Sequence, residues 1–480
     1  MEVGVLQSHL IYPSGAAIGA FAGGFAYTND AKKATSGSYS AYGTTWTTND
    51  VIGVALDADS GSLTFYKNGV SQGVAYTIAA GTILFSGLIP AIAIYRNTGI
   101  TQSAVFNFGQ RDFEYTPPTG FKALNTANLP APTIKKPGSY FDVSLYTGNG
   151  SAQTVTNSGG FTPDLVWHKG RSVGYSHSLV DSVRGNSNVL FSDTTSAEQN
   201  PGAQLDITTN GFIATYRAAN LANNQSSATY VGWQWKAGGS GSSNTAGSIT
   251  STVSANPTAG FSIITYSGNS TNNSTIGHGL GVAPVMIITK VRTGATNEGW
   301  PVWHQAFGNT QYVQLNQTHS VATDSNIYGG SNNTAPTSTV YSVGPGGVTN
   351  TSGRTYVAYC FAEVEGYSKF GSYTGNGSSD GPFVYTGFRP AWIMIKQTSP
   401  NVGSWQIWDT QINQYNATYG RFNADRDLGE QGSLPIDILS NGFKIRHTDG
   451  ATNESGYNFI CIAFAEHPFG GSGVSPATAR

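Results

Sequence analysis

The chain has 480 residues, of which 39% are hydrophobic, 12% aromatic and only 10% charged. That length suits about three or four domains, and the many Gly, Ser, Thr and Asn residues favour short strands joined by tight turns over long helices. With 24 basic and 26 acidic residues the net charge is −2, so no basic field for binding nucleic acid is expected. The sequence holds no membrane-spanning apolar run and no signal peptide, which predicts neither membrane insertion nor Sec export.

Residues 1–128 form the first predicted domain, which begins with a β-meander. Asp50–Asp57 alternates as a strand does, Leu63–Lys67 follows as a second strand, and Asn68-Gly69 is a strong hairpin signal. In order and spacing these segments, with Ile89-Pro90-Ala91, Phe106–Gln110 and Phe113–Phe121, resemble the SPRY (B30.2-like) family over residues 1–122. The resemblance implies a bent, concanavalin-type β-sandwich that binds partners through its loops and has no catalytic activity.

Met1–Val5 resembles a strand that normally lies inside a SPRY domain, with another strand before it. We therefore expect the first strand to be missing, to be supplied by a partner, or to lie in a longer protein of which this chain is a fragment.

An internal repeat organises the rest of the chain. A Tyr-x-Gly-Asn segment is followed after 17, 18 and 17 residues by a proline, and 6 residues later by a lysine. Each repeat closes with an apolar, strand-like run. These features predict three tandem, related β-sandwich-like domains and an all-β fold class. The three tyrosine-to-lysine stretches are Tyr146–Lys169, Tyr266–Lys290 and Tyr373–Lys396, and the closing runs are Tyr230–Trp235, Tyr356–Glu363 and Phe459–Glu466.

Composition places the domain boundaries. Residues 129–138 are rich in proline and predict a stiff linker, whereas residues 240–258, almost wholly Gly, Ser, Thr, Asn and Ala, predict a flexible one. The second and third repeats meet near Gly366 without a linker and are expected to stack rigidly. The predicted repeats are 139–239, 259–366 and 367–469, followed by a Gly/Ser/Pro-rich tail at 470–480. Residues 139–469 also resemble uncharacterised repeat domains of predicted structural proteins of tailed phages.

Motifs for catalysis and metal binding are not found. Asp57-Ala58-Asp59 lacks the glutamate that completes a calcium loop, and the eight histidines have no zinc-site spacing, so no metal and no cofactor are predicted. Cys360 and Cys461 lie in apolar runs and are expected to be buried free thiols.

Acidic residues recur only in part among the repeats. Glu363 matches Glu466, where the first repeat has Ala237, and Asp181 matches Asp409. Recurrence without full retention indicates a structural role, so no catalytic residue is predicted. Asp409 and Glu466 would be the candidates if the chain were an enzyme.

Aromatic residues supply the candidate ligand-binding positions. Trp300 and Trp303 match Trp405 and Trp408, and tryptophans three apart on a strand point to opposite faces, so one of each pair is a candidate exposed platform for stacking sugars. The candidates in the first domain are Trp46, Tyr95 and Arg96. The repeated lysines, Lys169, Lys290 and Lys396, are expected to be solvated residues at strand ends.

The favoured function is a non-enzymatic, lectin-like phage structural protein in a fibre, the tail or the head surface. It would recognise a host-surface glycan or protein, contact other virion proteins and form a homo-oligomer, with a trimer expected. The alternatives are a secreted or surface adhesin and a polysaccharide-degrading enzyme. The expected location is the surface of the extracellular particle.

Overall fold

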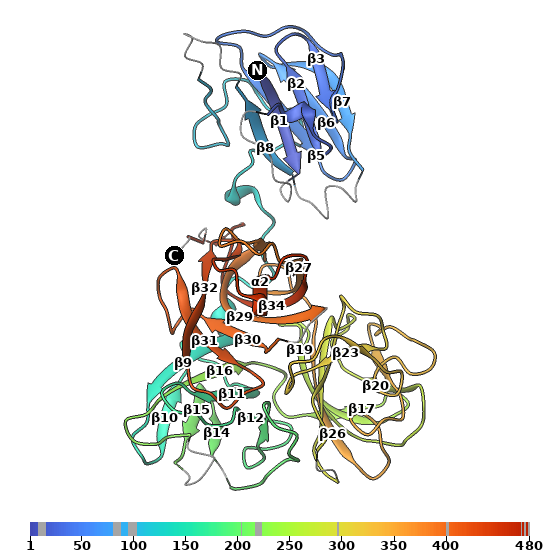
Figure 1. The fold of residues 1–480 in the computed structure, drawn as a ribbon, viewed down its shortest axis with the longest axis vertical. Helices are drawn as coiled ribbons and strands as arrows, with labels where there is room; N and C mark the ends of the chain where they lie inside the picture. Colours follow the sequence, from blue (N-terminus) through green and yellow to red (C-terminus); the bar gives the residue numbers. More distant parts are fainter. Residues whose placement is uncertain are drawn as a thin grey trace. The chain divides into compact units, whose positions relative to one another are not determined.

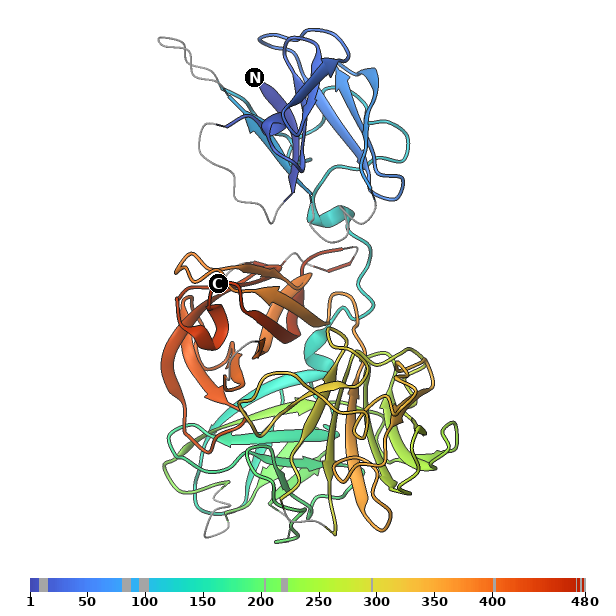
Figure 2. The same ribbon diagram turned by 45° about the vertical axis from the view of Figure 1, so that its right-hand side comes forward.

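A computed structural model describes residues 1–7, 16–79, 88–94, 103–202, 204–216, 223–294, 297–399, 403–471, 473–474 and 477–478. The chain divides into two compact units, Met1–Asn128 and Leu129–Arg480 (Figures 1 and 2). The described residues are almost entirely strand and loop, and their α-helical part is α2 (Gly450–Asn453), so the all-β prediction is confirmed. None of the helices described is long and apolar enough to cross a membrane.

The first unit is a β-sandwich of a five-stranded sheet, in the order β4-β3-β2-β1-β8, and a three-stranded sheet, β5-β6-β7. The two sheets enclose a core in which Leu63 and Phe65 are completely buried. Every pairing within each sheet is antiparallel. The strands are β1 (Glu2–Gln7), β2 (Gly24–Thr28), β3 (Lys32–Thr35), β4 (Ser38–Ala41), β5 (Ile52–Asp57), β6 (Ser62–Lys67), β7 (Val70–Thr77) and β8 (Leu88–Ala93).

The predicted meander is present as β5, β6 and β7. Asn68 and Gly69 connect the last two strands with φ values of 49° and 79°, the left-handed pair that a tight hairpin turn requires. The Phe106–Gln110 segment, which is part of the SPRY resemblance, is not a strand here: residues 103–128 hold only turns, extended chain and the 3-10 turn Thr126–Asn128. Its aromatic residues are partly solvated, Phe106 being 41% exposed.

The second unit contains three large sheets with one shared strand order. In each repeat the first strand pairs with the last, and the last pairs with the strand at or just after the repeated proline. That strand pairs with the next strand along the chain, which pairs in turn with the one after it. This common order is the arrangement that the sequence repeat predicts. The ordered strands are β9-β16-β11-β12-β13 in the first repeat, β19-β26-β21-β22-β23 in the second and β27-β34-β29-β30-β31 in the third.

Those strands have the following bounds: β9 (Phe141–Thr147), β11 (Leu165–Gly170), β12 (Ser178–Asp181), β13 (Leu190–Phe191), β16 (Thr229–Trp235), β19 (Phe261–Ser267), β21 (Met286–Val291), β22 (Pro301–His304), β23 (Gln311–Gln314), β26 (Thr355–Phe361), β27 (Ser368–Thr374), β29 (Phe388–Ser399), β30 (Gln406–Asp409), β31 (Thr418–Asn423) and β34 (Asn458–Pro468).

A smaller sheet lies against one face of each large sheet and encloses a core belonging to that repeat alone. In the third repeat β31 pairs with β32, so the small and large sheets are continuous there. The small sheets are β10-β15-β14, β20-β25 and β28-β33-β32, built from β10 (Gln153–Thr156), β14 (Leu205–Thr208), β15 (Gly211–Ala214), β20 (Ser274–Gly277), β25 (Val340–Val343), β28 (Phe383–Tyr385), β32 (Gln431–Leu439) and β33 (Gly442–Ile445).

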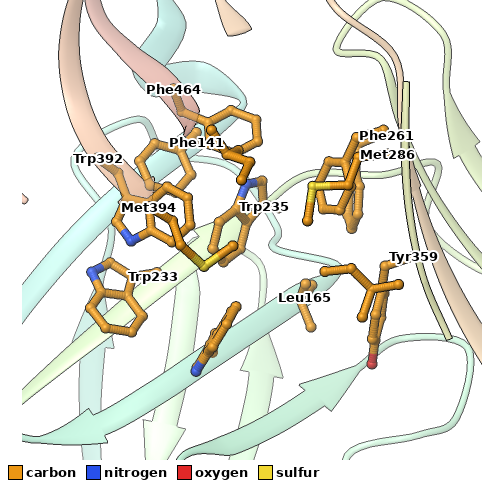
Figure 3. Packing of buried hydrophobic residues seen from close by; sticks show 14 of the residues in the cluster. Phe141, Leu165, Trp233, Trp235, Phe261, Met286, Tyr359, Trp392, Met394 and Phe464 are labelled. Carbon is orange, nitrogen blue, oxygen red and sulfur yellow. The ribbon is translucent and has the colours of Figure 1, made fainter. Parts of the chain in front are cut away.

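The opposite faces of the three large sheets meet in one shared core. Figure 3 shows Trp233 and Trp235 of the first sheet there with Met286 and Tyr359 of the second and Trp392 of the third. The packing there leaves an apolar cavity of only about 20 Å³, so the interior is close-packed. Each large sheet is therefore covered on both faces, which accounts for its long apolar runs.

Both predicted linkers are part of the second unit. Residues 242–256 form β17 (Ser242–Asn244) and β18 (Ser251–Asn256), which extend the second repeat's sheet beyond β19, while β24 (Ala322–Thr323) extends its other end. Val253 anchors the β17–β18 hairpin at 6% exposure, and Ile134 anchors the proline-rich segment in the shared core at 2%. The prediction of a flexible linker at 240–258 is therefore wrong, because a few well-spaced apolar residues hold a polar stretch in place.

The Tyr-x-Gly-Asn motif at the start of each repeat is a structural clasp. In the third repeat the Tyr373 ring stacks on Phe459 with centroids 5.1 Å apart, and Asn453 Oδ1 accepts from the backbone N–H of Asn376. A Cβ on Gly375 would lie 2.2 Å from Glu454 O, so only glycine fits. The same stacking and the same asparagine contact occur at Tyr146, Tyr230, Asn149 and Asn224, and at Tyr266, Tyr356, Asn269 and Asn350.

Candidate functional site

Trp300 and Trp405, two of the predicted ligand-binding residues, are completely buried in the shared core. The indole N–H of Trp300 donates to Phe191 O of the first repeat at 3.0 Å, and that of Trp405 donates to Gln314 O of the second at 2.8 Å. These tryptophans join one repeat to the preceding one. Their prediction as exposed platforms is wrong, because the strands they precede are covered on both faces.

Trp303 and Trp408 point to the opposite face, as the spacing predicts, but they also meet a core. They are 6% and 0% exposed, inside the separate cores of the second and third repeats. In the first unit Trp46 is only 9% exposed and packs against the sandwich core, so it offers no open stacking face either. Tyr95 and Arg96 lie outside the described residues.

Three equivalent hydrogen bonds join the repeats in a closed ring. Trp300 links the second repeat to the first, Trp405 links the third to the second, and His177 occupies the same position in the first repeat. His177 Nε2 lies 2.9 Å from Asn423 O of the third repeat, while its Nδ1 accepts from the Trp167 indole N–H. The donor at Nε2 therefore faces the carbonyl. The first repeat is thus bound to the third, so the three repeats form a closed ring within one chain.

The repeated lysines also lie inside this ring. Lys169, Lys290 and Lys396 are each 0% exposed, and burial lowers the pKa of each to about 8. Lys290 Nζ donates to Thr195 O of the first repeat at 3.0 Å, and Lys396 Nζ donates to Thr318 O and His319 O of the second at 3.0 and 2.9 Å. Their prediction as solvated residues is wrong. Each lysine faces the shared core and uses backbone carbonyls in place of water.

The recurring aspartates accept hydrogen bonds across the repeats. Tyr359 of the second repeat donates to Asp181 of the first at 2.8 Å, and Trp233 of the first donates to Asp409 of the third at 3.0 Å. The residue of the second repeat that corresponds to these aspartates by strand register is His304. The residue of the third repeat that corresponds to the donors Trp233 and Tyr359 is Ile462, whose side chain has no donor. Burial lowers the pKa of His304 to about 3, so its side chain is neutral. A neutral histidine thus replaces the aspartate at the junction where the partner repeat has no side-chain donor.

The other recurring acids are held in ion pairs. Glu363 contacts Lys369 at 2.6 Å, and Glu466 contacts Arg389 at 3.1 Å. Among the described residues no group of three or more His, Cys, Asp or Glu side chains is placed to hold a metal ion. Cys360 and Cys461 are buried free thiols, as predicted.

An open polar groove of about 230 Å³ remains on the second repeat. The β17–β18 hairpin builds one side of it, and paired residues set its floor: Ser243 faces Thr252 and Thr252 faces Thr265 across adjacent strands. The lining residues are Ser243, Thr250, Ser251, Thr252, Thr265, Tyr266, Ser267, Arg292 and Thr355.

Three hydroxyl groups of this groove are available to a ligand, whereas those of Ser251, Tyr266 and Thr355 are hydrogen-bonded within the chain. Those of Thr250, Thr252 and Thr265 make no hydrogen bond to any other residue that the structure describes. Arg292, at the end of the groove, is neutralised by Glu198, whose carboxylate accepts two hydrogen bonds of 2.9 Å from the Arg292 guanidinium. The groove is thus uncharged and rich in groups that both donate and accept. The groove was not predicted, because the Gly/Ser-rich composition of these residues indicated a linker, although the β-branched residues from Thr250 to Val253 are typical of a strand.

Each of the two units matches a known protein family. Residues 136–468, which contain the three repeats, match the domain of unknown function DUF7483. The chain belongs to the DUF7483 family. Residues 1–111 match the SPRY domain, which confirms the first resemblance. The phage-protein resemblance of the repeats remains an expectation, because this family's description names no role.

Curated relatives match over short stretches. The ATP-dependent RNA helicase DDX1 of Xenopus laevis is 32% identical over 104 residues, 22% of this chain and 13% of the helicase, and Ddx1 of Drosophila melanogaster is 33% identical over 98 residues, 20% and 13%. The E3 ubiquitin-protein ligase RKP of Arabidopsis thaliana is 36% identical over 86 residues, 18% of this chain and 6% of the ligase. The chain thus spans about an eighth or less of the length of these relatives. No solved structure matches it.

Proposed function

We propose that this DUF7483 protein is a non-catalytic recognition component of a phage particle that binds neutral host-surface glycan. The observation that carries the proposal is the uncharged groove on the second repeat, whose Thr250, Thr252 and Thr265 hydroxyls make no hydrogen bond within the described part of the chain. Pairs of hydroxyl groups held on a rigid sheet suit the hydroxyl pairs of a sugar, which need donors and acceptors together and no net charge.

The closed ring supports a binding role over catalysis. Asp181 and Asp409 are used in contacts between repeats, and Glu363 and Glu466 are used in ion pairs. The second unit is in this view a rigid scaffold that holds the groove open without reorganisation on binding. The SPRY domain provides a second recognition surface, since its family binds partners through loops.

Glycan-array screening of the full chain, followed by calorimetry with the best ligand, tests the proposal. Thr252→Val and Thr265→Val together keep the side-chain shape and remove two groove hydroxyls, so affinity is expected to fall by about tenfold or more. Thr154→Val and Thr156→Val on β10 form the matched control and should leave affinity unchanged. Absence of glycan binding by the unaltered chain, or full affinity in the groove variant, would overturn the groove assignment.

The particle assignment has its own test. Antibodies against the chain should label purified phage particles, and light scattering of the purified chain should return the mass of a homo-oligomer, with a trimer expected. A monomer mass at micromolar concentration would remove the fibre version of the proposal, and unlabelled particles would remove the virion location.

A further inference from the structure

Two exposed aromatic side chains stand on the outer face of the third repeat's small sheet. Phe383 and Tyr385 of β28 are 46% and 57% exposed, while Val384 between them is buried in the repeat's own core. Strand alternation therefore sends both rings to the same, solvated side. Side chains two residues apart on a strand are separated by about 6.8 Å, which is comparable to the size of a sugar ring.

The other two repeats show that the fold does not require these aromatic residues. Val384 pairs with Phe443 as Val155 of the first repeat pairs with Phe212, so the strands β28 and β10 correspond residue by residue. Where the third repeat has Phe383 and Tyr385, the first has Thr154 and Thr156, both exposed. The same sandwich thus forms with threonine at both positions.

In the second repeat the corresponding residues of β20 are Thr275 and Gly277. There the face is covered, since Ser248 exchanges hydrogen bonds of 2.8 Å with the backbone and side chain of Thr275. Exposed aromatic residues at this position are therefore found in the third repeat alone among the three.

Charged side chains of both signs lie beside Phe383 on the outer face. Phe383 lies opposite Lys444, and Lys444 lies opposite Asp437, so all three share the outer face. Lys444 contacts Asp380 at 2.7 Å, and Arg446 contacts Asp437 at 3.1 Å. Two acids and two bases leave this patch without net charge, yet rich in hydrogen-bond donors and acceptors.

We propose that Phe383 and Tyr385 form a stacking platform for a neutral oligosaccharide. Apolar faces of sugar rings would lie on the two aromatic rings, and the adjacent carboxylates and cations would bind hydroxyl groups. A nucleic acid or an acidic polymer would bring charge that the patch does not complement. The ligand class rests on the proposed function, but the site is separate from the groove on the second repeat.

The test replaces the two aromatic residues of the third repeat with those found at the same positions in the first. Phe383→Thr with Tyr385→Thr gives the third repeat the residues that the first repeat already carries in the same sandwich, so folding is expected to persist, as an unchanged melting temperature would show. Thr154→Ala with Thr156→Ala is the matched control. The full-length chain and both variants are titrated by calorimetry with the best neutral oligosaccharide from an array, and their attachment to host cells is measured.

The platform variant should lose affinity by about tenfold or more, as truncated aromatic anchors do, and the control should not. Full affinity in the platform variant would overturn this site while leaving the proposed function intact. No glycan binding by the unaltered chain would overturn both. Cell attachment that depends on the two aromatic residues but survives enzymatic removal of surface glycans would identify a protein as the occupant, which also overturns the oligosaccharide assignment.

Discussion

Asp409 should give the second unit a measurable pH dependence. Its carboxyl is completely buried, and burial raises its pKa from 3.8 to about 6, even though Trp233 and two backbone N–H groups hydrogen-bond to it. At pH values between 3.8 and about 6, Asp409 is mostly protonated in the folded chain and mostly ionised in the unfolded chain. The stabilisation is therefore fully present below about pH 4 and is lost as the pH rises through about 6. A rise of about two pKa units corresponds to about 3 kcal/mol of unfolding free energy.

The Asp409→Asn variant isolates this contribution. Burial lowers the pKa of His168 and His304 to about 3, which costs stability as the pH falls below 6.5 and partly masks the aspartate in the unaltered chain. Both histidines are present in the variant, so their effect cancels when the unfolding free energy of the variant is subtracted from that of the native chain. Urea unfolding followed by tryptophan fluorescence reports mainly the second unit, because Trp46 is the one tryptophan of the first.

The unfolding free energy of the native chain minus that of the Asp409→Asn variant should fall by about 3 kcal/mol between pH 4 and pH 7. Trp233→Phe removes a hydrogen bond that favours the carboxylate, so in that variant the loss should extend to higher pH. A difference that is flat with pH, or that rises, would show that Asp409 is ionised throughout this range and would refute the reasoning.

Three further predictions concern stability and accessibility. Gly375→Ala should lower the unfolding free energy by about 1–3 kcal/mol, because its Cβ would lie 2.2 Å from Glu454 O; chemical unfolding measures this, and an unchanged midpoint would contradict the clasp. Cys360 and Cys461 should react with a thiol reagent only after denaturation, because they are buried and burial raises both thiol pKa values. Mild proteolysis should spare residues 242–256, and early cleavage there, detected by mass spectrometry, would show that the β17–β18 hairpin is open in solution.

Local patterns predicted the strands well. Asn68-Gly69 placed a hairpin correctly because its left-handed conformations are a property of the two residues themselves. The repeat of tyrosine, proline and lysine likewise placed three sheets with one strand order, since residue spacing along a strand fixes which positions share a face.

The candidate site depended on information that spacing does not contain. The pattern around Trp300 and Trp303 correctly placed them on opposite faces, but only the packing of three repeats shows that both faces are covered. The same limit explains why the lysines were wrongly predicted to be solvated. A charged residue at a strand end is expected to face solvent unless a neighbouring repeat supplies carbonyls, as Thr195 does for Lys290. Phe383 and Tyr385 were overlooked for the converse reason, since an aromatic residue in a short strand is usually part of a core.

The closed ring of three unequal repeats has a consequence for how such a protein diversifies. A trimer of identical chains must place each substitution at three symmetry-related positions, so a change that suits one surface is imposed on all. Joined in one chain, each copy varies alone: an aspartate at one junction becomes a histidine at another, and a threonine on one face becomes phenylalanine on the next. The shared interior holds the architecture constant while each outer face is free to acquire its own specificity.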